Sequence, residues 1–244
     1  MGVTQDGLLN GRVVLRQTAR GYRAGMDAAL LAAACDAKPG DRVVEAGCGP
    51  GAALLAAAAR RPQARFTGVE RDPQALALAL ENMALNGLDE RVTARLGDVT
   101  QPFKALGLER FDAAMANPPY FDDASAIRGP APAKTQAWIA EGGLAAWTGF
   151  LLKAVRDGGA ITVIHRADRL ADLLNHLGAK AGSFRIRPVQ PFADAPAKRV
   201  LVRAIRGGKA PLVLLPALVL HDAGGAHSAA AEAILRGTAD LPWT

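Results

Sequence analysis

The sequence predicts an α/β fold built on a mostly parallel sheet. Short apolar runs typical of buried strands alternate with Ala- and Leu-rich runs of helical length, almost to the end of the chain. Turns such as Pro39-Gly40-Asp41 separate them. At 244 residues, the chain can bury one large core. We expect a single domain over residues 1–244, with an N-terminal strand and helix (1–38), a core sheet (39–208) and a C-terminal strand and helix (209–244).

The composition restricts the possible function classes. A net charge of +6 and a pI of about 9.7 are compatible with a polyanionic partner, although a GC-rich genome, which favours Arg codons, gives the same excess. Cys35 and Cys48 lie in no Cys/His cluster, which argues against a disulfide framework and against a metal site. No basic and apolar leader is visible, and the apolar stretch 211–220 is too short to span a bilayer. We expect a cytoplasmic monomer without membrane contact.

The first predicted elements are a strand at 11–17 and a helix at 28–35. Asp27 is placed to cap the helix, and Arg23 reads as a surface charge. Both also lie in a loop that enters the sheet before its first core strand, where they could close over a small charged ligand. The cap is the simpler interpretation of Asp27, and we keep Arg23 and Asp27 as candidate cofactor contacts.

A strand, a glycine-rich loop and a helix form the first candidate site. Residues 42–46 read as a strand, Gly47, Gly49 and Gly51 form the loop, and a helix follows at 52–61. This order lets backbone amides approach a nucleotide-like ligand. The next strand, 64–70, ends in Glu70, a residue type that accepts both hydroxyls of a ribose. These features fit either NAD or S-adenosylmethionine (SAM).

A helix at 73–86 and a strand at 91–98 come next. Leu76, Leu80 and Met83 recur at helical spacing, which predicts a stripe that faces the core. The strand ends in Gly-Asp, and Asp98 is placed to accept a hydrogen bond from an adenine amino group. A turn-forming Asp would give the same sequence.

The stretch Asn117-Pro118-Pro119-Tyr120 follows the apolar strand 111–116. Two prolines fix φ and remove two backbone donors, so the corner is stiff and presents oxygens. The Asn117 side-chain oxygen and the Pro118 carbonyl can accept hydrogens from a planar amino group, which favours a tetrahedral nitrogen able to attack. Tyr120 offers a flat face for a base. Taken alone, a rigid loop that ends a strand explains the stretch equally well.

The four strand ends reinforce one another, because ligands of open parallel sheets bind at the carboxyl ends of the strands. Glu45 with the glycine loop, Glu70, Asp98 and Asn117–Tyr120 would share that edge. This set resembles a class I SAM-dependent methyltransferase that acts on amino groups. A more specific resemblance, to the bacterial tRNA(Val) adenine-37 N6-methyltransferase family, is carried by GYRAGMDAALL (21–31), NPPYF (117–121), IHRADRL (164–170), RVLVR (199–203) and LVLHD (218–222).

The resemblance implies a Rossmann-like class I methyltransferase fold, with a seven-stranded mostly parallel sheet, a C-terminal antiparallel hairpin and helices on both faces. It implies SAM as the cofactor and tRNA as the partner. The implied cofactor contacts are Gly47, Gly49 and Gly51, ribose binding by Glu70 and adenine contact by Asp98, and the target base is handled by Asn117, Pro118, Pro119 and Tyr120. The chain departs from the pattern at Glu45, where many methyltransferases have Asp, and at His227-Ser228, where an aromatic residue and Ser/Thr are expected.

The remaining elements complete the predicted sheet. The Gly/Pro/Ala-rich loop 122–135 is a linker or a segment that orders on RNA. A helix at 138–156 and a strand at 160–165 follow, and we interpret His165 as a polar residue at a strand end. A helix at 167–177, strands at 184–189 and 199–205, a strand at 212–220 and a helix at 229–235 close the chain. The helix at 138–156 buries mostly Trp138, Leu144, Trp147, Leu151 and Leu152.

The hairpin formed by strands 184–189 and 199–205 carries the densest basic group in the chain. Its alternating charges indicate a solvated strand face first and an RNA backbone contact second. The members are Arg185, Arg187, Lys198, Arg199, Arg203, Arg206 and Lys209.

We therefore expect SAM to bind over Glu45–Gly51, Glu70, Asp98 and Asn117, and the methyl group to pass to the N6 of an adenine in a tRNA anticodon loop. The same Asn-Pro-Pro-Tyr corner fits the side-chain amide of glutamine, so a protein-glutamine N5-methyltransferase is the nearest alternative. An adenine methyltransferase acting on rRNA or DNA is the second. An NAD-dependent oxidoreductase leaves Asn117–Tyr120 unexplained.

Overall fold

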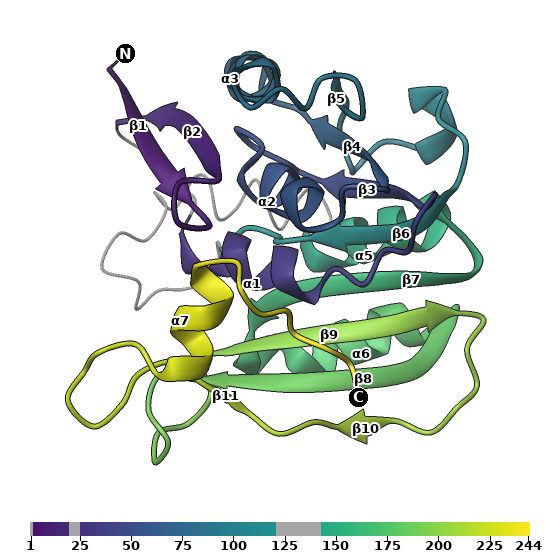
Figure 1. Ribbon diagram of the computed structural model, residues 1–244. Coiled ribbons are helices and arrows are strands. Elements are labelled where there is room, and N and C mark those ends of the chain that lie inside the picture. The colour runs from purple at the N-terminus through teal and green to yellow at the C-terminus, as the bar shows by residue number, and fades with distance from the viewer. Residues whose placement is uncertain (1, 20–24, 121–142) are drawn as a thin grey trace.

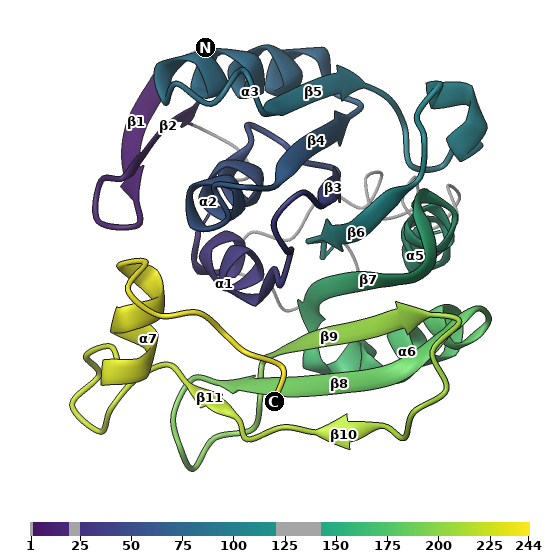
Figure 2. The ribbon, with the colours of Figure 1, turned by 45° about the vertical axis from the view of Figure 1, so that its right-hand side comes forward.

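The computed structural model describes residues 2–19, 25–120 and 143–244. A twisted sheet forms the middle layer, with helices on both of its faces (Figures 1 and 2). The strands are β1 (Val3–Leu8), β2 (Val13–Thr18), β3 (Arg42–Ala46), β4 (Arg65–Glu70), β5 (Val92–Leu96), β6 (Phe111–Ala116), β7 (Val155–Arg166), β8 (Ala181–Gln190), β9 (Arg199–Arg206), β10 (Val213–Leu214) and β11 (Leu218–Val219). The α-helices are α1 (Met26–Ala34), α2 (Ala52–Arg60), α3 (Pro73–Leu85), α5 (Gly143–Ala154), α6 (Leu170–Gly178) and α7 (Ala229–Leu235).

The topology of the main sheet confirms the predicted fold class. In the described part of the chain, the strand order is β10-β8-β9-β7-β6-β3-β4-β5, with β11 also paired to β8. Strands β5, β4, β3, β6 and β7 run parallel, whereas β9 runs antiparallel to both β7 and β8. The long strands thus form the mostly parallel sheet with the antiparallel hairpin that the resemblance implies.

Helices cover the sheet on both sides. In Figure 2, α1, α2 and α3 lie on one side and α5 and α6 on the other. Helix α2 is Ala-rich and buried from Ala52 to Ala58, which lets it pack closely on the strands. Gly68 of β4 is required by this packing, because a Cβ there would lie 2.5 Å from the Cys48 sulfur and 3.0 Å from Leu54.

The orientation of helix α3 differs from the prediction that Leu76, Leu80 and Met83 all face the core. Met83 is buried as expected, but Leu80 is 48% exposed, so the prediction that Leu80 faces the core is wrong. The buried face of α3 consists of Ala79, Asn82 and Met83. Helical periodicity alone could not distinguish the two faces, because leucine and alanine occupy both of them.

A separate two-stranded hairpin, β1–β2, lies against α3, and β1 was not anticipated from the sequence. Asn86 bonds the backbone of Val14 through both ends of its amide, with Oδ1 accepting from the N–H (2.8 Å) and Nδ2 donating to the carbonyl (2.7 Å). Asn82 bonds the backbone of Arg16 in the same way, with Oδ1 accepting from the N–H and Nδ2 donating to the carbonyl (2.8 Å each). Asn82 Nδ2 also donates to the carbonyl of Pro50, in the glycine loop (2.9 Å).

The other elements mostly lie where the sequence predicted them, with three differences. The strand expected at 212–220 is two short strands, β10 and β11, each parallel to β8. The helix expected at 167–177 begins as a 3-10 turn, η2 (Ala167–Arg169), before α6. Strand β7 begins earlier than predicted, and its register with β6 shifts between Phe111 and Ala113. Trp138 and the loop 122–135 lie outside the described residues.

Arginines hold the C-terminal segment on the rest of the fold. Arg187 donates to the carbonyls of Pro216 (2.9 Å) and Pro242 (2.6 Å), and Arg185 donates to that of Pro211 (3.2 Å). Two further side chains of the basic hairpin form ion pairs, Arg203 with Asp36 and Arg206 with Asp157. Much of the basic hairpin is therefore engaged within the chain.

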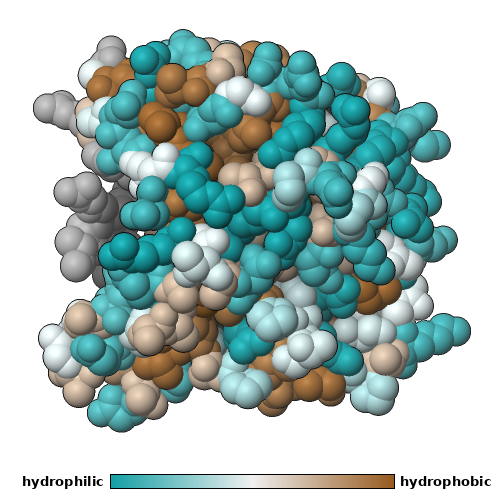
Figure 3. Space-filling view, in the orientation of Figure 1, coloured by the Kyte–Doolittle hydropathy of each residue, from teal (hydrophilic) through white to brown (hydrophobic). Residues whose placement is uncertain are grey.

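The surface is predominantly polar in Figure 3, with apolar side chains gathered in its upper part over α3 and the β1–β2 hairpin and again along its lower part. Val3, Leu80 and Leu85 are the exposed large apolar residues of these elements. Among the helices that the structure describes, none is long and apolar enough to cross a membrane.

Candidate active site

The sheet register brings the predicted strand ends to one edge. Ala46, the last residue of β3, pairs with Val69 of β4 and with Ala116 of β6. Glu70 pairs with Leu96, and Ala116 pairs with Val163 of β7. The glycine loop, Glu70, Asp98 and Asn117 therefore follow directly from the carboxyl ends of adjacent parallel strands.

The glycine loop has a backbone conformation that would be strained in any residue with a side chain. Gly47, Gly49 and Gly51 have φ of +65°, +54° and +91°, a region that favours glycine. A Cβ on Gly49 would meet nothing within 4 Å, so this part of the loop has open space above it. At Gly47 a Cβ would lie 2.2 Å from the indole of Trp147, a half-buried residue of α5 that the sequence placed mostly in the core.

Two carboxyl groups flank this loop. Glu70 Oε2 accepts from the N–H of Gly49 (2.8 Å), and its Oε1 accepts from those of Arg71 and Asp72 (2.8 Å each). Glu45 is only 3% exposed, and its Oε2 has no hydrogen-bond partner among the described residues. Burial raises the pKa of Glu45 well above its ordinary value, and the charge of Glu70 raises that pKa further. Although a backbone hydrogen bond from Leu54 reaches the carboxyl group, Glu45 Oε2 is thus a buried acceptor without a donor in the part of the chain that the structure describes.

Asp98 lies next to Glu70 along the edge. Its Oδ1 accepts from the N–H of Thr100 (2.9 Å), and its Oδ2 lies 3.9 Å from Arg71 Nη1. The Asx turn explains the first contact, as the alternative interpretation of the sequence expected. About a third of the side chain remains exposed (32%), so the carboxylate can also accept from a ligand.

Asn117, Tyr120 and Asp27 come together at the end of β6. The Tyr120 hydroxyl lies 2.9 Å from Asn117 Oδ1 and 3.0 Å from Asp27 Oδ2. Pro118 is buried and Pro119 is half-buried, which fits a stiff corner. The expectation that Asp27 caps its helix is wrong: α1 has Gly25 as its N-cap residue and no side-chain cap bond. Asp27 instead lies in the first turn, with its carboxylate on the Asn-Pro-Pro-Tyr corner.

Two residues that the sequence did not assign to the site complete this cluster. Arg199 Nε donates to Asp27 Oδ2 (3.1 Å), and the guanidinium carbon lies 4.7 Å from the centre of the Tyr120 ring. The imidazole of His165 stacks on Tyr120, with ring centres 5.0 Å apart and planes inclined by 22°. The sequence placed Arg199 in the basic hairpin and in the stretch RVLVR, but gave it no role in the site, because its contacts are to residues distant in the chain.

His165 is a buried neutral imidazole. It is 2% exposed, and its pKa is lowered to about 4, mainly by burial and then by Arg169 and Arg166. An imidazole with such a pKa is a weak proton acceptor near neutral pH. This agrees with its interpretation as a polar residue at a strand end.

Arg23, another predicted cofactor contact, lies outside the described residues. In the tail, Ser228 Oγ accepts from the N–H of Ala231 (3.1 Å) and caps α7, while the His227 ring stacks on that of His221 at 5.2 Å. Within the ranges that the structure describes, no group of three or more His, Cys, Asp or Glu could hold a metal ion.

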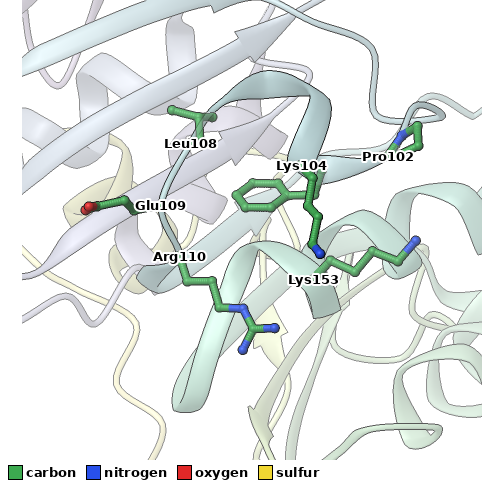
Figure 4. A pocket seen from close by; sticks show the side chains of 7 residues that line it. Pro102, Lys104, Leu108, Glu109, Arg110 and Lys153 are labelled. Atoms are coloured by element: carbon green, nitrogen blue, oxygen red, sulfur yellow. The ribbon is translucent and has the colours of Figure 1, made fainter.

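A pocket of about 610 Å³ lies away from these residues, at the amino end of β6 and the last turn of α5. Figure 4 shows the lysines of its lining and Glu109 directed to different sides, with no convergence on a common point. None of the predicted site residues lines this pocket. Its lining consists of Pro102, Phe103, Lys104, Leu108, Glu109, Arg110 and Lys153. The polar groups that converge are those at the carboxyl edge, so we place the candidate site there.

Comparisons with known proteins identify the family of the chain. A family model described as a methyltransferase domain matches residues 37–179. A Porphyromonas gingivalis protein named tRNA1(Val) (adenine(37)-N6)-methyltransferase is 33% identical over 132 residues, covering 52% of this chain and 51% of its own. A Moorella thermoacetica protein named release factor glutamine methyltransferase is 32% identical over 157 residues, covering 61% and 54%. This chain spans about half the length of the curated relatives it matches.

Solved structures share the fold. A predicted O-methyltransferase from Agrobacterium tumefaciens superposes with a TM-score of 0.74 at 25% identity, covering 88% of this chain and 98% of its own. TrmN from Thermus thermophilus has a TM-score of 0.53 at 21% identity, covering 73% and 47%, and supports the fold alone.

Proposed function

This chain belongs to the methyltransferase domain family, and from that premise we propose that it transfers a methyl group from SAM to the exocyclic N6 of an adenine in tRNA. The observation that carries the proposal is the Asn117–Tyr120 corner, placed at the same sheet edge as Glu70 and Asp98. Relatives named as tRNA1(Val) adenine-37 N6-methyltransferases support tRNA as the acceptor.

The residues of the edge fit SAM as the cofactor. Bound SAM supplies a methyl group on a sulfonium, whose sulfur leaves as a neutral thioether. The buried Oε2 of Glu45, for which the described residues supply no donor, suits a cationic amino group, and Glu70 suits ribose hydroxyls. Asp98 suits the adenine amino group, and the open space above Gly49 leaves room for the ligand to approach the backbone.

The corner acts on the acceptor nitrogen. The Asn117 side-chain oxygen and the Pro118 carbonyl each accept one hydrogen of the amino group, which directs the nitrogen lone pair toward the methyl group. No strong base is required in the transition state, because the proton leaves after the methyl group is transferred. The low pKa of His165, about 4, is consistent with this order of events.

An adenine in an anticodon loop reaches such a corner more easily than one in a duplex. The base must leave its stack to enter the site, at a cost of a few kcal/mol that is smallest in a single-stranded loop. The net charge of +6 favours an RNA partner in general. We propose adenine 37 of a valine tRNA as the acceptor.

The test measures transfer of labelled methyl from SAM to total tRNA from a strain that lacks this protein. We expect N6-methyladenosine in the valine tRNA fraction after nucleoside digestion and mass analysis. Asn117→Ala should abolish transfer while SAM affinity, measured by calorimetry, stays near the wild-type value. Asn175→Ala, an exposed residue of α6, is the matched control and should retain both. Parallel loss of SAM binding and transfer in Asn117→Ala would contradict the role assigned to Asn117.

A second candidate is methylation of a glutamine side-chain amide, which presents the same planar NH2 group. It is favoured by relatives named as glutamine methyltransferases of a release factor and of ribosomal protein uL3. The same assay with these two proteins as acceptors separates the candidates. Labelling of a protein acceptor together with unlabelled tRNA would replace the tRNA proposal and leave the family assignment intact.

A further inference from the structure

Arg199 begins β9 and meets the site from a part of the chain far from Asn117. Its register with β7 places it opposite Arg166, at the carboxyl edge of the sheet. It donates from Nε to Asp27 Oδ2 (3.1 Å) and from Nη1 to the carbonyl of Lys198 (3.1 Å), and its guanidinium lies over the Tyr120 ring. Three contacts fix the planar group in one orientation.

This ion pair is partly shielded from water. The Arg199 and Asp27 side chains are 33% and 21% exposed. Burial alone would lower the pKa of Arg199, but the neighbouring Asp27 and Tyr120 raise that pKa overall, so the guanidinium stays charged.

The hydroxyl of Tyr120 has one proton for two neighbours. Both Asp27 Oδ2 and Asn117 Oδ1 lie within 3.0 Å of it, and one proton cannot serve both oxygens. A carboxylate is the stronger acceptor, so the proton goes to Asp27. The hydroxyl oxygen then faces Asn117 as an acceptor, and the two ends of an Asn amide are assigned from such networks. This network turns the amide over relative to the placement in which Oδ1 lies 2.9 Å from the hydroxyl, so that the NH2 group faces Tyr120 and the oxygen faces the acceptor side.

We propose that Arg199 is a positioning residue for methyl transfer, acting through Asp27 and Tyr120 to set the orientation of the Asn117 amide. The inference rests on the proposed function, since it assigns Asn117 the acceptor amino group. Arg199 itself touches neither substrate nor cofactor in this scheme. Its removal leaves the Tyr120 ring without this cation and Asp27 without the guanidinium of its ion pair.

The kinetic test compares Arg199→Gln with Arg203→Gln. Arg203 lies four residues further on β9, on the same side of the strand, and pairs with Asp36 at 2.7 Å. We expect Arg199→Gln to lower kcat by about 10- to 100-fold, the effect of a small misplacement of reacting groups, with KM for SAM and for tRNA nearly unchanged. Arg199→Lys should recover part of the loss, and Arg203→Gln should keep the wild-type kcat.

A double mutant distinguishes positioning from general weakening. If Arg199 acts through the Tyr120 hydroxyl, Arg199→Gln should lower kcat little further in a Tyr120→Phe background. Full additivity of the two losses would overturn the proposal. So would equal kcat in Arg199→Gln and Arg203→Gln while the wild-type enzyme methylates tRNA, a result that leaves the proposed function standing.

A spectroscopic readout tests the network without any acceptor. The chain has two tyrosines, Tyr22 and Tyr120, so Tyr22→Phe leaves Tyr120 as the sole phenol. Because Arg199 and the Tyr120 phenolate attract each other, Arg199→Gln should move the phenolate absorbance midpoint to higher pH. An unchanged midpoint would overturn the contact, even if the protein proves to methylate glutamine instead of tRNA. If Arg199→Gln fails to fold, Arg199→Met, which also removes the positive charge, replaces it in both tests.

Discussion

Substitution of Arg60 by Met should detach the C-terminal segment from α2. The Arg60 side chain is 2% exposed and donates to the carbonyls of Ala239 (2.8 Å) and Ile234 and to Asp240 Oδ1 (3.0 Å). Methionine keeps much of the apolar stem but supplies no donor. Each lost bond from a charged donor to a partly buried carbonyl costs about 1.5 kcal/mol. The bond to Asp240, whose side chain is 44% exposed, adds about 0.5 kcal/mol. We expect a total loss of about 3–4 kcal/mol.

The measurement is urea denaturation followed by circular dichroism. With a slope of about 2–3 kcal/mol per molar urea, the midpoint should fall by roughly 1–2 M. Arg236→Met is the matched control, because Arg236 lies in the same segment but is 57% exposed and, among the described residues, pairs only with Glu232, four residues before it. Its midpoint should stay close to wild type. Equal midpoints in Arg60→Met and Arg236→Met would refute the reasoning that the buried hydrogen bonds of Arg60 contribute more to the free energy of unfolding than the exposed pair of Arg236.

Two further predictions concern the glycine loop and its carboxyl group. Burial, and then Glu70, raises the pKa of Glu45 above its ordinary 4.5, so the folded state binds this proton more tightly than the unfolded state and loses stability as pH rises above that value. The melting temperature of Glu45→Gln relative to wild type should therefore increase between pH 5 and pH 8, and a constant difference would contradict this. Gly47→Ala should lower the melting temperature, because φ is +65° and the Cβ would meet Trp147. Adding Trp147→Ala should recover part of that loss, whereas no recovery would exclude the clash as its cause.

The parts of the fold and site that depend on local pattern could be predicted from the sequence. The glycine loop, Glu70 and Asp98 follow strands whose apolar runs are short and bounded by turns, and the sheet register then brings them to one edge. Asn117 was placed by the same reasoning. The roles assigned to these residues, like the single-domain organisation, stay predictions.

The parts that depend on contacts between distant segments could not be predicted. An Asp next to the start of a helix is typical of an N-cap, which is why the sequence predicted that role for Asp27. The carboxylate has other partners, Tyr120 and Arg199, because α1, the end of β6 and the start of β9 lie together in the fold. The exposure of Leu80 depends on which face of α3 meets the hairpin, and the hairpin docks through Asn82, a polar residue that apolar periodicity does not detect.

The two asparagines of α3 also act as a substitute for a neighbouring strand. Residues one helical turn apart, such as Asn82 and Asn86, rise by about 6 Å along a helix, close to the roughly 6.8 Å that separates alternate residues of a strand. Their amides therefore match the outward N–H and C=O groups of Val14 and Arg16, which would otherwise form an open edge for another chain to pair with. A slip of the hairpin by one residue would break both matches at once. Because Asn82 also bonds Pro50, the helix that closes this edge sets the hairpin register and the position of the glycine loop together.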